Sequence, residues 1–238
     1  MSVTKKTATQ AVAPIADATT ETGVSRADQF PSYFIEKLNR RTGELEMVPK
    51  FKYLEGMPKE YRFDGRIGTF GPVSGGGVNK LKVRPIAYRF FEDQLLGQTD
   101  RKLWGEIFFV DETDAVSSIL FHTHSLRNLQ EVIAPLFYED MMLEDVVLLC
   151  SSEKMETKKW IDGKESSITY FLAKFDFEEA PIADVDERIA FANTVRIYRR
   201  QTLTENAVTS ASQRFFDPFL HAPTDDADEA ETTAEVEL

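Results

Sequence analysis

The chain has 238 residues, of which 42% are hydrophobic and 29% are charged, so it holds enough apolar residues for a packed core. Its formal net charge is −12, from 28 Lys plus Arg against 40 Asp plus Glu, which excludes a polycation that binds nucleic acid by bulk charge alone. A single cysteine excludes a disulfide scaffold and a cysteine-based zinc site. No apolar run is long enough for a membrane span and no secretory signal is visible, so we expect a soluble, cytoplasmic protein.

The two ends differ from the middle in composition. Residues 1–29 are rich in Thr, Ala and Val and lack aromatic residues, which predicts a disordered N-terminal arm. Residues 221–238 hold seven acidic residues and no Lys or Arg, which predicts a disordered acidic tail. We therefore expect one folded domain over residues 30–220.

The first half of this domain has the patterns of β-strands. Residues 61–70 alternate apolar and polar, with Gly65 and Gly68 predicting a bend or bulge. A glycine-rich loop follows at 71–77, and a second strand is expected at 80–91, interrupted by Pro85. A turn at 97–100 leads into a third strand at 103–110.

The second half begins with a helix. Apolar residues at three- and four-residue spacings predict it over 125–138, with Ser125 as its N-cap and Pro135 near its end. Two further strands are expected at 146–150 and 168–177, joined by a hairpin around the Asp-Gly pair at 162–163. A final helical segment is expected around 184–204.

Basic and aromatic residues are interleaved on the predicted strands. Residues 50–110 hold eleven basic residues against seven acidic ones, a local balance of +4. Because side chains alternate across a strand, three strands would each present cations and rings on one outward face. The hairpin adds further lysines and a tryptophan. Cations neutralise phosphates and rings stack unpaired bases, so we expect a nucleic-acid interface made of Arg62, Arg66, Lys80, Lys82, Arg84, Tyr88, Lys102, Trp104, Phe108, Lys158, Lys159, Trp160 and Lys164.

The order of three strands, a helix and two strands resembles that of the oligonucleotide-binding (OB) fold, a five-stranded Greek-key barrel. The predicted barrel covers about residues 58–178, with the helix between strands 3 and 4 and extra elements at both ends. With its acidic tail, the chain resembles bacterial and phage single-stranded DNA-binding proteins, although it ends in Glu-Val-Glu-Leu and not in the Pro-Phe tip of the bacterial family. The resemblance implies single-stranded DNA as ligand, and a tail that docks replication or repair proteins or covers the cationic face.

Other interpretations stay open. Alternating cations also occur on solvated sheet faces, so a protein-interaction scaffold or a single-stranded RNA-binding protein is an alternative, and a homo-oligomer is compatible with each. His122 and His124, with Glu106 upstream, suggest a metal site, but the acid that a JAMM-type metallopeptidase needs after the histidines is missing. Cys150 ends an apolar strand without a base partner. We therefore expect no enzyme activity, no metal and no cofactor.

Overall fold

The computed structural model describes residues 30–219, except for 96, 98, 162, 163 and 206. The predicted N-terminal arm, at 1–29, and acidic tail, at 221–238, lie outside the described residues. The strands are β1 (Phe34–Leu38), β2 (Leu45–Pro49), β3 (Lys59–Asp64), β4 (Thr69–Pro72), β5 (Lys80–Asp93), β6 (Lys102–Val110), β7 (Val116–His122), β8 (Val146–Ile161), β9 (Lys164–Glu179) and β10 (Val208–Ala211). The helices are α1 (Thr123–Tyr138), the short 3₁₀ turn η2 (Leu143–Asp145) and α2 (Ile182–Thr194).

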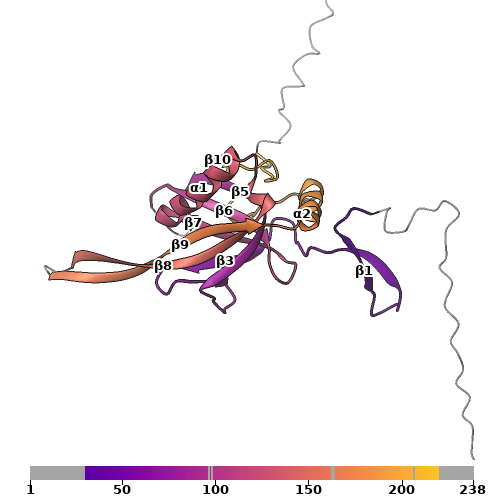
Figure 1. Cartoon of the computed structure of the whole chain (residues 1–238), viewed down its shortest axis with the longest axis horizontal. Helices are drawn as coiled ribbons and strands as arrows, with labels where there is room; N and C mark the ends of the chain where they lie inside the picture. The colour runs from indigo at the N-terminus through magenta and orange to yellow at the C-terminus, as the bar shows by residue number, and fades with distance from the viewer. Residues whose placement is uncertain (1–29, 96, 98, 162–163, 206, 220–238) are drawn as a thin grey trace, which may run out of the picture. The chain divides into compact units, whose positions relative to one another are not determined.

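Among the described residues, eight strands form one curled sheet, an open half-barrel (Figure 1). Their order is β4-β3-β7-β6-β5-β8-β9, and β10 pairs with the second half of β5. Among the strand pairs of this sheet that the structure describes, β3 and β7 are parallel and the others are antiparallel. The long strand β5 pairs with β8 over Lys80–Val83 and with β6 from Arg84 onward, so it connects the two halves of the sheet.

The turn between β3 and β4 brings one edge of the sheet back toward the other. The backbone N–H of Phe171 in β9 donates to the carbonyl of Gly65 at 2.7 Å. Gly68 has a φ of +71°, and a Cβ at this position would lie 2.6 Å from the Phe171 ring. The predicted bend at the two glycines is therefore a tight turn, and it packs directly on the opposite edge of the half-barrel.

Hydrophobic residues pack on both faces of the sheet. On the inner face, Phe70, Ile107, Phe109 and Phe121 pack with α1 through Leu126 and other helix residues. On the outer face of β5 and β6, Ile86, Phe108 and Val110 pack under Phe191 of α2 and Phe215 of the C-terminal segment. The central strands are therefore buried on both faces, as in a three-layered domain.

The prediction of a mainly β protein is confirmed, but several elements differ from the sequence prediction. Residues 61–70 form two strands instead of one, and β1, β2, β7 and β10 were not predicted. The helix begins at Thr123 and continues through Pro135 to Tyr138. Ser125 does not cap it, because its hydroxyl is buried and accepts a hydrogen bond from the backbone N–H of Ala173 at 3.0 Å. The last helix ends at Thr194, ten residues before the predicted end.

Two hairpins extend from the half-barrel. The first, β1 and β2, forms a two-stranded sheet of its own, and Tyr33 at its base packs on Phe191 of α2. The second is the end of β8 and β9, which pair along all 16 residues of each strand (Figure 1). None of the helices in the described part of the chain is long and apolar enough to cross a membrane.

Candidate nucleic-acid interface

The predicted cationic face of β5 is divided by a bulge. The pairing of β5 with β6 shifts register between Pro85 and Ala87, so the alternation of side chains changes there. Lys82 and Arg84 stay on the outer face, whereas Tyr88 packs against the inner core, on the same side as Val83. The prediction that Arg84 and Tyr88 share one face is therefore wrong.

Trp104 and Phe108 lie beneath another layer of the protein. Their exposed fractions are 1% and 0%, and the Trp104 indole N–H donates to the backbone carbonyl of Asp93 at 3.1 Å. Phe108 packs on Phe215 with ring centroids 5.8 Å apart. The prediction that these two rings face solvent is wrong, because segments far along the chain cover the outer face of β6.

A buried ionic network fixes this covering segment to the sheet. Arg89 and Glu106 are both fully buried, and the guanidinium of Arg89 donates to Glu106 at 2.9 Å and to the backbone carbonyl of Thr202 at 2.7 Å. The Thr202 hydroxyl donates to the same Glu106 oxygen at 2.8 Å. Arg199, also buried, forms an ion pair with Glu60 of β3 at 3.1 Å. We call the described residues of 50–153 and 173–219 the body. These arginines stabilise the body and are not accessible to a ligand.

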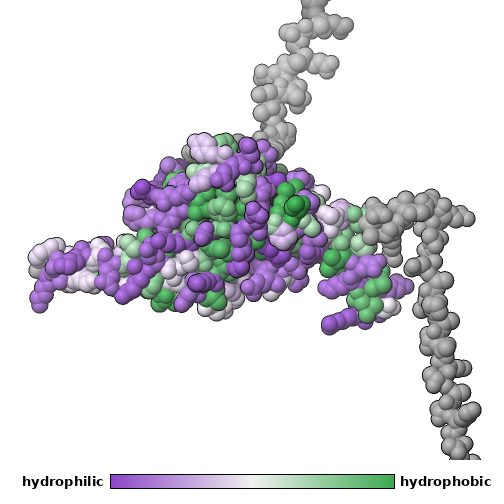
Figure 2. All heavy atoms as spheres, viewed as in Figure 1, coloured by the Kyte–Doolittle hydropathy of each residue, from purple (hydrophilic) through white to green (hydrophobic). Residues whose placement is uncertain are grey.

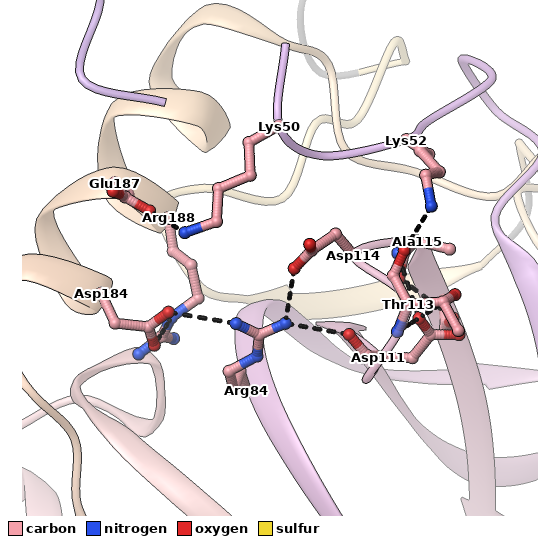
Figure 3. A network of polar contacts seen from close by, with 11 residues as sticks. Lys50, Lys52, Arg84, Asp111, Thr113, Asp114, Ala115, Asp184, Glu187 and Arg188 are labelled. Atoms are coloured by element: carbon pink, nitrogen blue, oxygen red, sulfur yellow. Dashed lines mark hydrogen bonds and ion pairs between the residues drawn. The ribbon is translucent and has the colours of Figure 1, made fainter. Parts of the chain in front are cut away.

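Arg84 is held by acidic partners on both sides (Figure 3). Its guanidinium lies 3.0 Å from Asp114 and 3.2 Å from Asp184, and it donates to the carbonyl of Asp111 at 2.9 Å. It thereby connects the turn after β6 to α2. Because two carboxylates already neutralise it, Arg84 is a weak candidate for a phosphate contact.

The neighbouring carboxylate of Asp111 organises the turn before β7. It accepts hydrogen bonds from Lys59 at 2.7 Å, from the hydroxyl of Thr113 at 2.7 Å and from the backbone of Ala115 at 3.1 Å. Burial by itself raises the pKa of Asp111, but the hydrogen bonds outweigh it and hold this pKa well below its usual range. Asp111 is therefore ionised at neutral pH, and Lys59 is its ion-pair partner.

Arg62 and Arg66 are exposed, and each pairs with an acid two residues away. Arg62 lies 2.9 Å from Glu60, and Arg66 lies 2.8 Å from Asp64. The hydrogen bonds from Arg66 lower the pKa of Asp64 to about 2. Exposed pairs of this kind contribute little to stability and exchange readily, so both arginines remain available to an anionic ligand.

The end of the β8–β9 hairpin keeps the predicted composition in exposed positions. We call residues 154–172 the arm. Trp160 has an exposed fraction of 76%, and Lys158, Lys159 and Lys164 around it are all exposed. Lys158 forms an ion pair with Glu165 at 3.3 Å. The predicted ring and cations therefore lie at the end of a narrow ribbon that is open to solvent, with Trp160 and Lys158 on one face and Lys159 and Lys164 on the other.

The outer face of the ribbon continues from the arm into the body. Lys80 lies opposite Ser151, which lies opposite Lys174, and Met155 lies opposite Tyr170 four pairs further along. Because side chains alternate, all of these lie on one face with Lys82 and Lys159. The sequence prediction missed Tyr170 and Lys174, although their even spacing along the strand is the signal that would have placed them on this face.

The glycine-rich loop lies beside the start of this face. A cavity of about 210 Å³ is lined by Tyr61, Gly76, Lys80, Lys82 and the turn at Asp111. Lys82 also forms an ion pair with Glu178 at 2.7 Å. Lys102 lies elsewhere, on a groove of about 450 Å³ along α1 that Arg127 also lines. The predicted interface is therefore split into an arm, a cavity beside the glycine-rich loop and separate exposed cations.

The residues considered for catalysis have structural contacts. Glu106 binds Arg89, and the His122 ring packs on Trp104 with centroids 5.0 Å apart. Burial, and after it the charge of Lys102, lowers the pKa of His122. Burial raises the pKa of the Cys150 thiol far above its usual range. In the described ranges, no three His, Cys, Asp or Glu side chains are grouped as a metal site would need.

The chain was compared with models of protein families, with curated proteins and with solved structures, and none of the three comparisons found a match.

Proposed function

We propose that this protein is a non-catalytic single-stranded DNA-binding protein whose main contact is the arm. The observation that carries the proposal is the exposure of Trp160 among Lys158, Lys159 and Lys164 at the end of a long hairpin. Ring faces stack unpaired bases, each contributing about 1–3 kcal/mol, and cations neutralise the phosphates between them.

The order of elements supports an OB-like arrangement within the larger sheet. The series β5, β6, β7, α1, β8 and β9 has three strands, a helix and two strands, and β5 pairs with both β6 and β8. In the OB fold the loop between the fourth and fifth strands binds ligands, and the arm occupies the same place in this series. The face of strands 2 and 3, which OB folds also use, would correspond to β6 and β7, whose outer side is covered here by α2 and the C-terminal segment.

Charge in the arm is modest, so base stacking carries much of the proposed affinity. Residues 154–172 contain four lysines, at 154, 158, 159 and 164, against three acids, at 156, 162 and 165, a balance of +1. At the base of the arm, Lys80, Lys82 and Lys174 lie on the face of Lys159, opposite Trp160, and Lys82 and Lys174 are paired there with Glu178 and Glu153. Trp160 and Lys158 lie on one face of the ribbon and Tyr170 and Lys159 on the other, so a strand that stacks on Trp160 would follow the face of Trp160 and Lys158.

The acidic residues at 225–237 would act on the same cations. A segment with seven acids and no base can occupy the ribbon face when DNA is absent, and can dock replication or repair proteins when DNA displaces it. Truncation after residue 220 is then expected to raise the affinity for DNA at low salt. Unchanged affinity would remove autoinhibition from the proposal and leave DNA binding by the arm in place.

Tryptophan fluorescence tests the main proposal directly, because the two tryptophans differ in exposure. Oligo(dT) is expected to quench the emission of Trp160, and the buried Trp104 is expected not to respond. Trp160→Ala should weaken binding about 5- to 150-fold, the equivalent of one lost stack, whereas Trp160→Phe should keep most of the affinity and lose the quenching. Trp104→Phe is the matched control and should keep the quenching.

The choice of oligonucleotide separates the proposal from its alternatives. Duplex DNA should compete poorly for the arm, since its bases are already stacked. An equal response to oligo(U) would favour single-stranded RNA as the ligand. Absence of binding by any single strand would overturn the proposal and favour a protein-interaction scaffold.

A further inference from the structure

The β1–β2 hairpin carries apolar side chains that the described part of the chain leaves uncovered. Leu38 and Leu45 lie directly opposite each other, next to the turn, with exposed fractions of 57% and 52%. Ile35, on the other face, is 43% exposed. Hydrophobic side chains are visible on this hairpin in Figure 2. A lone two-stranded hairpin is only marginally stable in water, so a second surface that covers these leucines would stabilise it.

The turn of this hairpin is basic and held by side-chain hydrogen bonds. The Asn39 side chain donates to Glu46 at 2.6 Å and accepts from the backbone N–H of Arg41 at 2.9 Å. Arg40 and Arg41 are both exposed at the turn. At the other end, the Tyr33 hydroxyl is 2.7 Å from that of Thr194, which anchors the hairpin to α2. The leucines are therefore presented by a preorganised element, which lowers the entropic cost of binding.

A groove at the C-terminal end of α1 has the complementary properties. Its volume is about 430 Å³, and its lining includes Tyr88, Phe90, Ile133, Phe137, Tyr138 and Met142. Phe137 and Tyr138 are 73% and 85% exposed, unusually high for rings of this size. The arm and its ribbon face do not contribute to this groove.

Two acidic residues flank the groove at the end of α1, whereas the hairpin turn is basic. Glu139 and Asp140 follow Tyr138 directly and are exposed. The last turn of α1 contains no basic residue, so the partial negative charge of the helix C-terminus adds to these two carboxylates. The hairpin and the groove are therefore complementary in polarity and charge. The hairpin has arginines beside two leucines, and the groove is apolar with carboxylates beside it.

We propose that the β1–β2 hairpin of one copy docks into the α1 groove of a second copy. The contact joins two different surfaces, so each copy keeps one free hairpin and one free groove, and association continues from head to tail into open chains. The interface is small, and we expect dissociation constants that are roughly micromolar. The inference does not depend on the proposed DNA binding, because neither surface includes the arm.

Mixing two variants tests this arrangement without any nucleic acid. The hairpin variant is Leu38→Ser/Leu45→Ser, and the groove variant is Phe137→Ser/Tyr138→Ser. Sedimentation velocity of the full chain should show concentration-dependent association, and each variant alone should associate at least tenfold more weakly. An equimolar mixture should regain near wild-type affinity and stop at the dimer, because each variant retains the surface that the other lacks. A double substitution of exposed residues elsewhere, Ile67→Ser/Ile182→Ser, is the matched control and should associate like the wild type.

Charge reversal gives a second test that leaves the apolar residues in place. Arg40→Glu/Arg41→Glu should weaken association, and adding Glu139→Lys/Asp140→Lys to the same chain should restore it. A protein that stays monomeric at about 100 μM would overturn the proposal and leave the two surfaces to other partners. A mixture of the serine variants that fails to associate would also overturn it, because it would exclude a contact between hairpin and groove.

Discussion

The body and the arm of this protein use basic residues in opposite ways. In the body, Arg89 is fully buried and bound to Glu106, and Arg84 lies between two carboxylates. In the arm, Lys158, Lys159 and Lys164 are exposed around an exposed Trp160. Both regions have basic and aromatic residues close together in the sequence.

The difference shows that this pattern does not distinguish a ligand surface from a sheet face that another layer of the protein covers. Arginine suits the buried positions because its planar guanidinium can bind a carboxylate and a backbone carbonyl at once, as Arg89 does. Lysine predominates on the arm, where its charged end stays in water. Substitutions in the body should therefore change stability, and substitutions in the arm should change binding.

The largest expected effect is on stability in the body. Glu106→Ala leaves Arg89 buried without its carboxylate and should lower the free energy of unfolding by about 3–5 kcal/mol. Urea unfolding measures the change. Glu156→Ala removes an exposed partner of Lys154 and is the matched control, with an expected change within about 0.5 kcal/mol. Equal effects of the two substitutions would contradict the contrast between body and arm.

A smaller loss of stability, with a defined pH dependence, is expected at Asp111. Asp111→Asn weakens the hydrogen bonds from Lys59 and from the turn, and should cost about 1.5–3 kcal/mol at pH 7. Folding lowers the pKa of Asp111, so its charge contributes fully to the free energy of unfolding above the unfolded-state pKa of about 4. This contribution is lost progressively as the pH falls from there toward the folded-state pKa. The difference between wild type and variant in urea unfolding should therefore shrink from pH 5 toward acid. A difference that stays constant over this range would show that the charge of Asp111 is not what stabilises the turn.

The smallest change is in the salt dependence of binding. Replacing Lys158, Lys159 and Lys164 by Gln should leave the urea midpoint unchanged and lower the slope of log K against log salt by about 2, if each lysine neutralises one phosphate. Titrations with oligo(dT) at several salt concentrations give the slope. Lys37→Gln/Lys52→Gln/Arg200→Gln removes three exposed cations outside the arm and should leave the slope unchanged. A similar loss of slope in both variants would place the interface elsewhere.

The sequence predicted much of the fold where the pattern is local. The helix over 125–138 and the strands at 80–91, 103–110, 146–150 and 168–177 all lie within observed elements, and the predicted Asp-Gly turn at 162–163 lies outside the described residues. The missed strand β7 follows directly after the acidic turn at 111–114, and its burial depends on β3 and β6 on either side. Its short apolar run has no periodicity that distinguishes it from the start of the helix.

The site was predicted in part. The exposed arm follows from a polar hairpin with a tryptophan, and the structure places Trp160, Lys158, Lys159 and Lys164 there as expected. Tyr88 was assigned to the wrong face because a bulge at Pro85 changes the alternation, and the sequence indicates such a bulge only as a possibility. Trp104 and Phe108 were assigned to solvent because nothing near them in the sequence shows that residues around 191–215 cover them.

By itself, the amino-acid sequence determined the β character, the principal helix and the ring and cations of the arm, because these depend on periodicity and turn residues within a few positions. Only the tertiary structure decided which of the alternating faces meets water. That outcome depends on contacts such as Arg89 with Thr202, between residues more than a hundred positions apart. Side-chain alternation defines two faces for every strand, but the free energy gained by burying one of them depends on the segment that packs against it.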